Sequence, residues 1–428
     1  MRVGIVRNAA DVGGGGIFQY EKAFLEALSE IAPGFAAEFL CLTSRQSDLA
    51  ALAHFGGLNY RGLTIHMLDK PPPRQLPPDR YIRLQPTALP PDPDPDHVYF
   101  DRRGANLVRD ADVDLIVQLS PVANAFSLRM PFIVPIFDLN HRLQPEFPEV
   151  SAFGEFNRRE YFYINTCRFA TLVLVDSEVS KEDVLRFYGN FISAERIRIL
   201  PYYPPIVRNP VPSPQECARV RKKHGLPERY FFYPAQFWRH KNHALILRAI
   251  RSIGDETNQA VHVVFCGAYS DHVRAANFKE VMALVEELGV GDRVHYLGLV
   301  PEEDMPALYA ASVALVMPTF FGPTNIPPFE SWHYGRPVIS SDIRGVRQQI
   351  GDAGLLVDPR SSIDLAQAML SVLRDDSLNE KLVAAGRQRL ASYTWATFVG
   401  RVTDILAEAC ECVSAGRTPA YPEIILAG

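Results

Sequence analysis

Short apolar runs alternate with segments of helical periodicity along most of the chain. In the first half, strands are predicted at 2–6, 38–43, 63–67, 115–119, 132–137 and 171–176, and helices at 17–31 and 155–170. In the second half, strands are predicted at 230–234, 262–266, 294–297, 314–317, 337–341 and 354–357, and helices near 243–253, 275–288, 305–311 and 362–374. Such alternation is typical of parallel sheets covered on both faces. It predicts an α/β fold of two doubly wound, Rossmann-like domains.

Two proline-rich segments interrupt this rhythm. Residues 201–214 carry six prolines and no helical period, so they predict a stiff linker between the domains. Residues 71–95 carry ten of the 34 prolines, which can neither pair within a sheet nor continue a helix. This second segment is expected to be an extended surface loop of the first domain, either a lid that contacts an acceptor or a solvated insertion.

Composition and charge narrow the classes of partner. The 428 residues are 47% hydrophobic and 22% charged, as in ordinary globular proteins, and the length suits two domains. The net charge of −5 gives no basic field, which argues against a nucleic-acid partner. No uncharged apolar stretch of about 18 residues predicts a membrane-spanning helix. Six scattered cysteines, without a C-x-x-C pair or a signal peptide, indicate reduced thiols and a cytoplasmic protein.

The segment 318–342 carries the strongest functional signal. A turn-rich stretch, 322–325, leads into a short helix expected over about 328–334, which a glycine ends before the next strand. A helix start with free backbone N–H groups is a ready site for an anion. Glu330, expected in that first turn, is suited to accept hydroxyl hydrogens. Phosphate donors beside such a carboxylate predict a nucleotide-sugar site, and an ordinary connection in an α/β domain is the alternative.

Cationic and glycine residues mark two further strand ends in the second half. Arg239, His240 and Lys241 place up to three cationic donors after the strand at 230–234. They suit a diphosphate, whose charge must be neutralised as it departs, whereas solvated surface cations are the alternative. Gly267 ends another strand and is expected to allow close approach of a ligand or of backbone.

Polar residues and glycines also follow strands in the first half. In the glycine run 13–16, Gly15 and Gly16 open a helix and would let backbone pass close to a phosphate or sugar; a tight turn is the alternative. Asp138 is placed to accept a sugar hydroxyl hydrogen or to orient an acceptor, and its alternative role is an N-cap. His141 is placed to hold a phosphate or an acidic acceptor, and its alternative is an ordinary polar surface residue.

Taken in order, these segments resemble the retaining glycosyltransferases of family 4, which have the GT-B fold. The resemblance runs through nearly the whole chain and is densest over about 230–359. It is carried by YPAQFWRHKNH, FCGAYSD, VHYLGLVPEEDMPALYAASVALVMPT, GPTNIPPFESWHYGRPVISSD and GDAGLLVDP. The resemblance implies an acceptor-side domain at 1–205, a nucleotide-sugar-binding domain at 206–395, and a C-terminal helix within 396–428 that crosses back to the first domain.

The resemblance also implies roles for individual residues. Lys241 would neutralise the donor diphosphate, Glu330 would bind the ribose hydroxyls, and backbone N–H groups around Asn325 would hold the phosphates or the donor sugar. The expected catalytic residues are Asp138, His141 and Lys241. The expected donor-binding residues are Gly15, Gly16, Gln236, Arg239, Lys241, Gly267, Thr324, Asn325, Ile326 and Glu330. No metal site is expected.

Three positions depart from the family pattern. Gly322 stands eight positions before Glu330, where a second glutamate is usual, so a carboxylate contact to the donor sugar is lost or supplied elsewhere. Gln236 replaces an arginine that is usual five residues before the lysine, and Arg239 would compensate for it. Phe137 replaces a histidine that often precedes the aspartate.

The resulting expectation is a metal-independent, retaining glycosyltransferase without a cofactor. It would move a hexose from a nucleotide diphosphate sugar to a glycan or lipid-linked acceptor in cell-surface polysaccharide assembly, with GDP-mannose as the expected donor and a UDP-sugar as the alternative. Peripheral contact with the inner face of a membrane is expected through aromatic and basic residues of 158–168, for which a half-buried helix is the alternative. The rival functions are a sugar-nucleotide epimerase or hydrolase and a catalytically silent sugar-nucleotide-binding protein.

Overall fold

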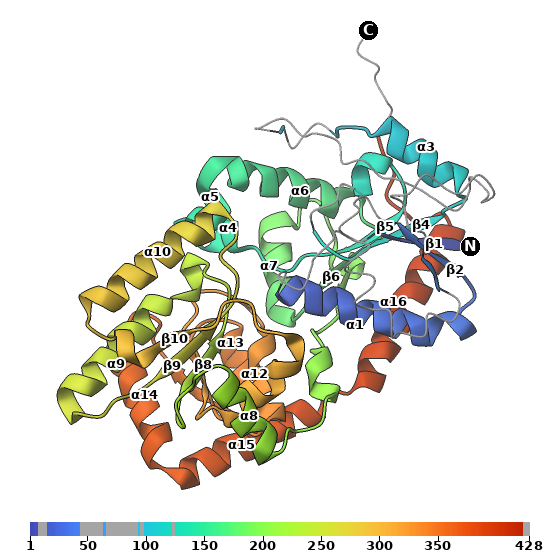
Figure 1. Ribbon diagram of the computed structural model, residues 1–428. Helices are drawn as coiled ribbons and strands as arrows, with labels where there is room; N and C mark the ends of the chain where they lie inside the picture. Colours follow the sequence, from blue (N-terminus) through green and yellow to red (C-terminus); the bar gives the residue numbers. More distant parts are fainter. Residues whose placement is uncertain (7–14, 43–62, 66–92, 95–97, 122–124, 423–428) are drawn as a thin grey trace, which may run out of the picture. The chain divides into compact units, whose positions relative to one another are not determined.

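The computed structural model describes residues 1–6, 15–42, 63–65, 93–94, 98–121 and 125–422 of the chain. They form two compact units, each built on its own parallel sheet (Figure 1). One unit comprises Met1–Pro145, Val150–Pro201 and Trp395–Gly428, and the other comprises Glu146–Glu149 and Tyr202–Thr394. Residues 13–14 of the glycine run and nearly all of the proline-rich segment 71–95 lie outside the described residues.

The first unit holds a seven-stranded sheet in the order β3-β2-β1-β4-β5-β6-β7. Its strands are β1 Arg2–Val6, β2 Glu38–Leu42, β3 Leu63–Ile65, β4 Leu115–Gln118, β5 Phe132–Pro135, β6 Leu172–Val175 and β7 Ile197–Ile199. Its helices are α1 Gly16–Ile31, α3 Arg102–Asp110, α4 Asn140–Leu143, α6 Glu155–Phe169, α7 Glu178–Tyr188 and α16 Trp395–Ser414, while α5 Pro148–Ser151 joins the two units. Strand β7 was not predicted, because it is a three-residue edge strand with Arg198 at its centre.

The C-terminal helix α16 packs on α1 within this unit. Val402 and Leu406 of α16 are fully buried. At its start, Trp395 Nε1 donates a hydrogen bond to Glu30 Oε1 over 2.6 Å. Helices from the two ends of the sequence therefore share one core.

The second unit holds a six-stranded sheet in the order β10-β9-β8-β11-β12-β13. Its strands are β8 Phe231–Pro234, β9 Val263–Cys266, β10 Val294–Tyr296, β11 Leu315–Met317, β12 Val338–Ser341 and β13 Leu355–Val357, each within one residue of its predicted bounds. Its helices are α8 Pro214–Lys223, α9 His243–Thr257, α10 His272–Glu287, α11 Met305–Ala311, α12 Ile326–His333, α13 Val346–Ile350, α14 Ser362–Arg374 and α15 Asp376–Ala391. Short 3₁₀ turns include η7 Pro205–Arg208, η8 Arg239–Lys241 and η10 Glu302–Asp304.

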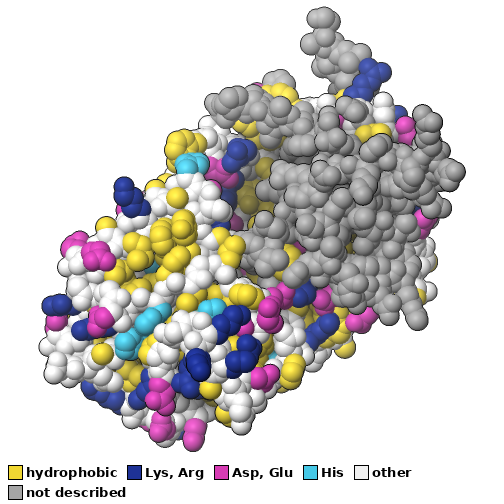
Figure 2. Space-filling model, in the orientation of Figure 1, with side chains coloured by type: hydrophobic (Ala, Val, Ile, Leu, Met, Phe, Trp, Pro, Cys, Tyr) yellow, Lys and Arg dark blue, Asp and Glu magenta, His cyan; other side chains and the backbone are white. Residues whose placement is uncertain are grey.

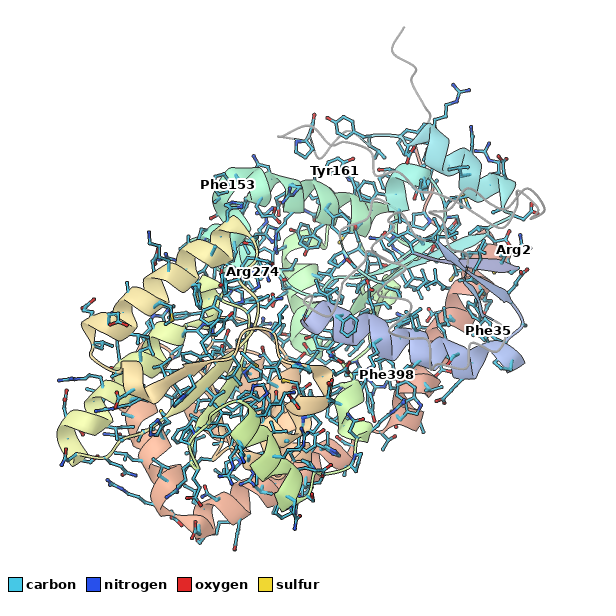
Figure 3. The ribbon with its side chains drawn as sticks, viewed as in Figure 1. Arg2, Phe35, Phe153, Tyr161, Arg274 and Phe398 are labelled. Carbon is cyan, nitrogen blue, oxygen red and sulfur yellow. The ribbon has the colours of Figure 1, made fainter. Side chains whose placement is uncertain are left out.

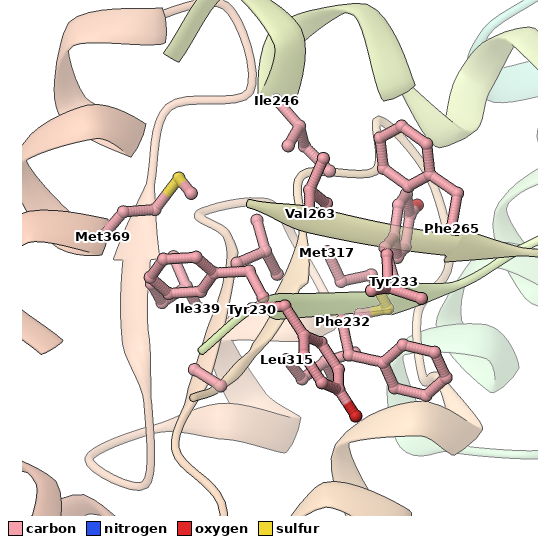
Figure 4. Close-up of a cluster of buried hydrophobic side chains, with 14 of the residues drawn as sticks. Tyr230, Phe232, Tyr233, Ile246, Val263, Phe265, Leu315, Met317, Ile339 and Met369 are labelled. Atoms are coloured by element: carbon pink, nitrogen blue, oxygen red, sulfur yellow. The ribbon is translucent and has the colours of Figure 1, made fainter. Parts of the chain in front are cut away.

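The core of the second unit forms around its central strands (Figure 4). Phe231, Phe232 and Tyr233 of β8 are all 1% exposed or less. Because successive side chains of a strand point to opposite faces, such a strand must be covered on both faces. Ile246 from α9 and Met369 from α14 pack in the same cluster. The near-continuous apolar run at 230–233 therefore reflects burial on both faces.

Helix α15 packs on α12 through a glycine. Trp332 of α12 is fully buried, and its Nε1 donates to the carbonyl oxygen of Ala353 over 3.0 Å. A Cβ atom built on Gly386 of α15 would lie 2.2 Å from Trp332 Cδ1. Any side chain at position 386 would therefore push the two helices apart.

Gly386→Ala is expected to destabilise the second unit by about 1–3 kcal/mol, because the added methyl group overpacks this contact. Gly400→Ala in α16 is the matched control, since a Cβ atom there meets nothing within 4 Å. Alanine is about 1 kcal/mol more favourable than glycine in a helix interior, so the control is expected to stabilise. Urea denaturation compares the two variants, and a Gly386→Ala variant as stable as the control would contradict this packing.

Candidate functional site

The candidate site lies where the order of the second sheet reverses, between β8 and β11. Ligands of open α/β sheets bind outside the carboxyl ends of strands at such a switch point. The turn η8, with Lys241 at its end, follows β8, and the segment 318–325 follows β11. The two predicted halves of the donor site are therefore neighbours at one edge of the second sheet.

Three hydrogen bonds tie these two segments together. The carbonyl oxygen of His240 accepts from the Phe320 N–H at 2.7 Å and from the Thr319 hydroxyl at 3.2 Å. Asn242 Nδ2 donates to the carbonyl oxygen of Pro318 over 2.9 Å. Asn242 itself has φ +59, in the left-handed region that asparagine tolerates better than most residues. The cationic turn and the segment after β11 thus form one hydrogen-bonded structure.

Lys241 is positioned by its backbone. Its N–H donates to the carbonyl oxygen of Trp238 over 3.0 Å, and its own carbonyl oxygen accepts from the Tyr233 hydroxyl over 2.8 Å. Because Tyr233 is fully buried in β8, this second bond anchors the turn to the sheet. Lys241 itself is half-buried.

Arg239 and Gln236 have partners of their own. Arg239 pairs with Glu280 of α10, and both side chains are about half exposed. Gln236 Oε1 accepts from Trp238 Nε1 over 2.9 Å. Arg239 therefore lies at the surface, paired with Glu280. An exposed pair of this kind contributes only about 0–1 kcal/mol, so an arriving anion can displace Glu280 at little cost.

Helix α12 begins at Ile326, earlier than predicted, so Glu330 lies in its second turn and not in its first. Pro327 and Pro328 occupy the first turn and carry no N–H. The N–H of the N-cap residue Asn325 is also used, since it donates to Gln349 Oε1 over 2.9 Å. Ile326 is therefore the residue of this turn that can offer an N–H to an anion, and the prediction of several free donors there is wrong.

The turn before α12 is held by Gln349 and by two glycines. Gln349 Nε2 donates to the carbonyl oxygen of Asn325 over 2.6 Å, so one amide side chain grips both backbone groups of that residue. Gly345 has φ +87, and a Cβ atom there would lie 2.5 Å from Pro323 Cα. Gly322 has φ +131, and a Cβ atom there would lie 2.7 Å from Asn325 Oδ1. A glutamate at position 322 does not fit this turn.

Glu330 is a buried carboxylate with 8% of its surface exposed. Its Oε2 accepts a hydrogen bond from the Tyr309 hydroxyl of α11. Burial raises the pKa of Glu330 to about 7, against the effect of that hydrogen bond. Within the described part of the chain, no cation forms an ion pair with Glu330. Its carboxylate is therefore suited to accept further hydrogens, such as those of a vicinal diol.

Gly267 lets two backbone segments approach closely, which is one of the two roles predicted for it. It has φ +149, and a Cβ atom there would lie 2.2 Å from the carbonyl oxygen of Ala235. Its N–H donates to the carbonyl oxygen of Gly298 over 2.9 Å. Glycine at position 267 lets the ends of β8 and β9 come together beside η8.

Glu149 is a residue of this site that was not predicted. Its Oε1 accepts from the His240 N–H at 2.9 Å and lies 2.6 Å from His240 Nδ1. The side chain of Glu149 is only 4% exposed. Burial opposes its ionisation, but the hydrogen bonds from His240 lower the pKa of Glu149. Phe147 packs beside it, with its ring 6.1 Å from the imidazole of His240. No sequence pattern links positions 149 and 240.

Glu149→Ala is expected to weaken binding of a nucleoside diphosphate roughly ten- to hundredfold, because buried donors of His240 would lose their acceptor and the turn carrying Lys241 would loosen. Glu149→Gln keeps an acceptor for the N–H and is expected to fall between wild type and Glu149→Ala. Isothermal titration calorimetry measures the affinities. Glu146→Ala, an exposed glutamate of the same segment, is the control, and equal affinities for it and Glu149→Ala would contradict this role.

The predicted residues of the first unit lie in a polar environment of their own. Asp138 Oδ1 accepts from the Asn140 N–H at 3.0 Å and from Arg159 Nη1 at 2.9 Å. Leu139, and not Asp138, is the N-cap residue of α4, so the N-cap alternative for Asp138 is wrong. Gly15, with φ +59, is the N-cap residue of α1, and Gly16 is its first residue. The predicted helix opening at Gly15 and Gly16 is therefore present.

His141 is fully buried, so the alternative of a surface residue is wrong. Its Nε2 lies 2.8 Å from Glu160 Oε1 and 3.0 Å from the Tyr188 hydroxyl, and Arg142 pairs with the same glutamate. Burial lowers the pKa of His141, against the effect of Glu160. A side chain with no exposed surface cannot touch an acceptor, so the expected contact between His141 and substrate is also absent here. His141 instead holds the element that carries Asp138.

The segment 158–168 lies in α6, and its aromatic side chains are buried. Tyr161, Phe162 and Tyr163 are 0%, 7% and 3% exposed. Tyr161 is labelled on α6 in Figure 3. The half-buried helix is therefore the correct reading of 158–168, and a membrane-docking aromatic face on it is wrong.

Among the described residues, no helix has the length and apolarity needed to cross a bilayer. In the same residues, no three His, Cys, Asp or Glu side chains are grouped to hold a metal ion.

Part of the second unit matches a known protein family. Residues 216–389 match the family described as Glycosyl transferases group 1. The chain is 28% identical over 278 residues to the O-antigen chain mannosyltransferase B of Escherichia coli, over 61% of this chain and 70% of that protein. It is 26% identical over 231 residues to the D-inositol 3-phosphate glycosyltransferase of Corynebacterium jeikeium, over 53% of this chain and 54% of that protein. The second match thus spans about half the length of the relative.

Solved structures resemble the chain over nearly its whole length. HepE of Anabaena, in complex with UDP and glucose, has a TM-score of 0.69 at 17% identity, over 95% of this chain and 99% of that one. Sucrose-phosphate synthase of Thermosynechococcus elongatus has a TM-score of 0.68 at 19% identity, over 96% and 99%. At these identities the likeness shows the fold alone. The chain therefore has the α/β GT-B fold that was predicted, and residues 216–389 of its second unit are similar to the glycosyl transferases group 1 family.

Proposed function

We propose that the chain is a retaining, metal-independent glycosyltransferase. It transfers a hexose from a nucleotide diphosphate sugar to a hydroxyl group of a glycan or lipid-linked acceptor in cell-surface polysaccharide assembly. The observation that carries this proposal is the hydrogen-bonded pair of segments at the switch point of the group 1 domain, η8 with Lys241 and the turn 318–325.

The chemistry of that edge suits departure of a diphosphate. The leaving group gains negative charge as its bond to the sugar breaks, and fixed positive groups in a partly buried site stabilise it at little cost in reorganisation. Lys241 supplies the charge, and the N–H of Ile326 supplies one backbone donor. Arg239 becomes available when the anion displaces Glu280.

Glu330 is proposed to bind the ribose of the donor. It is buried, it accepts one hydrogen bond from Tyr309, and the described residues give it no cation. The two hydroxyl groups of a ribose would donate to it and favour its ionised form, since hydrogen bonds to a carboxylate stabilise the charge. In the first unit, Asp138 is proposed to orient the acceptor.

Mannose is the proposed sugar and GDP the proposed nucleotide. The Escherichia coli relatives at 28% and 22% identity are mannosyltransferases, and the latter, WbdA, aligns over 62% of this chain and 31% of its own length. HepE, by contrast, binds UDP, which supports the alternative of a UDP-sugar. The glycine-built turn at Gly322 and Asn325 replaces a carboxylate contact to the sugar, so selectivity for the hexose rests on other groups.

A thermal-shift screen with GDP, UDP, ADP and their sugars tests the donor assignment. A ligand at 100 times its dissociation constant stabilises by about 2.7 kcal/mol, so the correct base is expected to stand apart from the others. GDP and GDP-mannose are expected to raise the melting temperature of wild type but not of Lys241→Ala. Equal shifts with all bases, or none, would contradict a nucleotide-sugar site.

A further inference from the structure

A cavity of about 500 Å³ lies in the second unit, away from the proposed donor site. Val313, just before β11, and Arg336, just before β12, line it, so it opens at the amino-terminal edge of the sheet. Lys241 and the turn 318–325 lie at the opposite, carboxyl edge. The remaining walls come from both ends of α8, the first turn of α15, the ends of α11, α12 and α14, and the loop residues 211–212 and 228–229.

Two half-buried guanidinium groups line this cavity without a carboxylate partner. Arg221 donates from Nη1 to the carbonyl oxygen of Glu228 over 3.2 Å, and its Nε is buried without a partner. Arg336 Nε is also buried without a partner, and among the described residues nothing forms an ion pair with its guanidinium group. A buried charge without a counter-ion is costly, so both groups are poised to bind an anion.

The two guanidinium groups share the lining of this cavity with a cysteine. Cys217 lies one helical turn before Arg221 on α8 and also lines the cavity. Burial raises the pKa of the Cys217 thiol, and the charges of Arg336 and Arg221 both oppose this rise. Burial likewise lowers the pKa of Arg336. Cys217, Arg221 and Arg336 thus all line one cavity, and both cations act on the thiol.

The rim of the cavity is mixed in charge but does not neutralise these cations. Glu228, Asp376 and Arg229 are exposed residues of the rim. Lys and Arg side chains gather near α8 on the face shown in Figure 2, where the last turn of that helix carries Arg221, Lys222 and Lys223.

The cavity is too large for a phosphate ion alone. Sites for small molecules measure about 300–1,000 Å³ and combine apolar walls with a few polar groups. Ala310, Val313 and Val372 supply apolar walls, and Tyr334 supplies an aromatic one. Guanidinium groups recognise phosphate oxygens through paired hydrogen bonds. We propose that this cavity binds a small organic phosphate, whose phosphate group Arg221 and Arg336 hold and whose organic part packs on the walls.

Isothermal titration calorimetry of the full chain with glucose 6-phosphate, glycerol 3-phosphate, inorganic phosphate and glucose tests this proposal. At least one organic phosphate is expected to bind with one-to-one stoichiometry and more tightly than inorganic phosphate, while glucose is not expected to bind. Arg221→Gln and Arg336→Gln are each expected to weaken that binding at least about tenfold, because each removes charge-assisted hydrogen bonds. Lys222→Gln, an exposed cation of the same helix, is the control and is expected to bind as wild type does.

The melting temperature of a ligand-free variant distinguishes a binding role of Arg336 from a packing role. Removing an unpaired buried charge is expected to leave the ligand-free protein as stable or more so, hence Arg336→Met should not lower its melting temperature. The same variant is expected to lose the stabilisation that the organic phosphate gives wild type. No binding of either organic phosphate, or equal affinity in wild type and the Arg221→Gln/Arg336→Gln double variant, would overturn the proposal. A ligand that occupies the donor site instead would give this second result.

Discussion

Lys241→Ala is expected to lower turnover by ~10²–10³-fold, the usual cost of losing one electrostatic contact to a developing charge. The turn that carries Lys241 is bonded both to the buried Tyr233 and to the segment after β11. Backbone contacts hold this turn, so alanine at position 241 is expected to leave the fold intact. Initial rates of sugar transfer measure the effect, and circular dichroism checks the fold.

Two further variants test whether the charge at position 241 accounts for the lost turnover. Lys241→Arg keeps a cation at the switch point and is expected to recover part of the lost turnover. Lys222→Ala removes an exposed lysine of the same unit and is expected to leave turnover unchanged. Full activity of Lys241→Ala would remove this residue from the site.

Glu330→Ala is expected to reduce kcat/KM for the nucleotide sugar by roughly 10–100-fold, because hydrogen bonds to a charged acceptor contribute about 1.5–3 kcal/mol. The alanine variant also leaves the buried Tyr309 hydroxyl without its acceptor. Glu330→Gln is therefore the better matched variant, since it retains an oxygen for Tyr309 but loses the negative charge. Steady-state kinetics of both variants measure the two contributions separately.

The raised pKa of Glu330 gives this residue a pH signature. Burial raises its pKa from the ordinary glutamate value of 4.5 to about 7, so between these values the folded state binds a proton that the unfolded state lacks. Its contribution to stability is therefore complete below about 4.5 and is lost as pH rises through about 7. Donor binding has the opposite trend, because the ionised form accepts the ribose hydroxyls.

Nucleotide affinity of wild type is thus expected to rise as pH increases through about 7, whereas that of Glu330→Gln is expected to stay flat. Titration calorimetry at a series of pH values, in buffers of equal ionic strength, makes the comparison. Parallel pH profiles for the two proteins would show that Glu330 does not contact the nucleotide.

The sheets were largely predictable from the sequence because buried parallel strands are short and apolar. The six strands of the second unit fall within one residue of their predicted bounds. Strand β7 and helix α8 lack that signal. Val220 is the single buried residue of α8. The helix begins with a capping box, in which the Ser213 hydroxyl oxygen accepts from the Glu216 N–H at 3.2 Å and Glu216 Oε2 accepts from the Ser213 N–H at 2.7 Å. A helix that is marked in the sequence by its capping residues alone, without an apolar stripe, is hard to distinguish from a linker.

The placement of the proposed site residues was predictable where they follow a strand, and not where long-range contacts set it. Lys241 and the turn 318–325 lie after β8 and β11, as predicted, and their roles stay predictions. Glu149 bonds His240, which is 91 residues away, and Gln349 bonds Asn325, which is 24 residues away. No local sequence pattern predicts contacts at these spacings. Buried polar clusters are equally hard to predict from the sequence. His141 is buried because it contacts Glu160 and Tyr188, which are distant in the sequence.

Acceptor-dependent release of the nucleoside diphosphate tests the central claim most directly. The chain is incubated with GDP-mannose or a UDP-sugar, with and without a panel of glycan and lipid-linked acceptors, and the linkage formed is determined by nuclear magnetic resonance. The account predicts release that depends on both the acceptor and Lys241, with the anomeric configuration of the donor retained. Release without acceptor would indicate a hydrolase or epimerase, and donor binding without release across the panel would indicate a silent binding protein. Either result would contradict the transferase assignment.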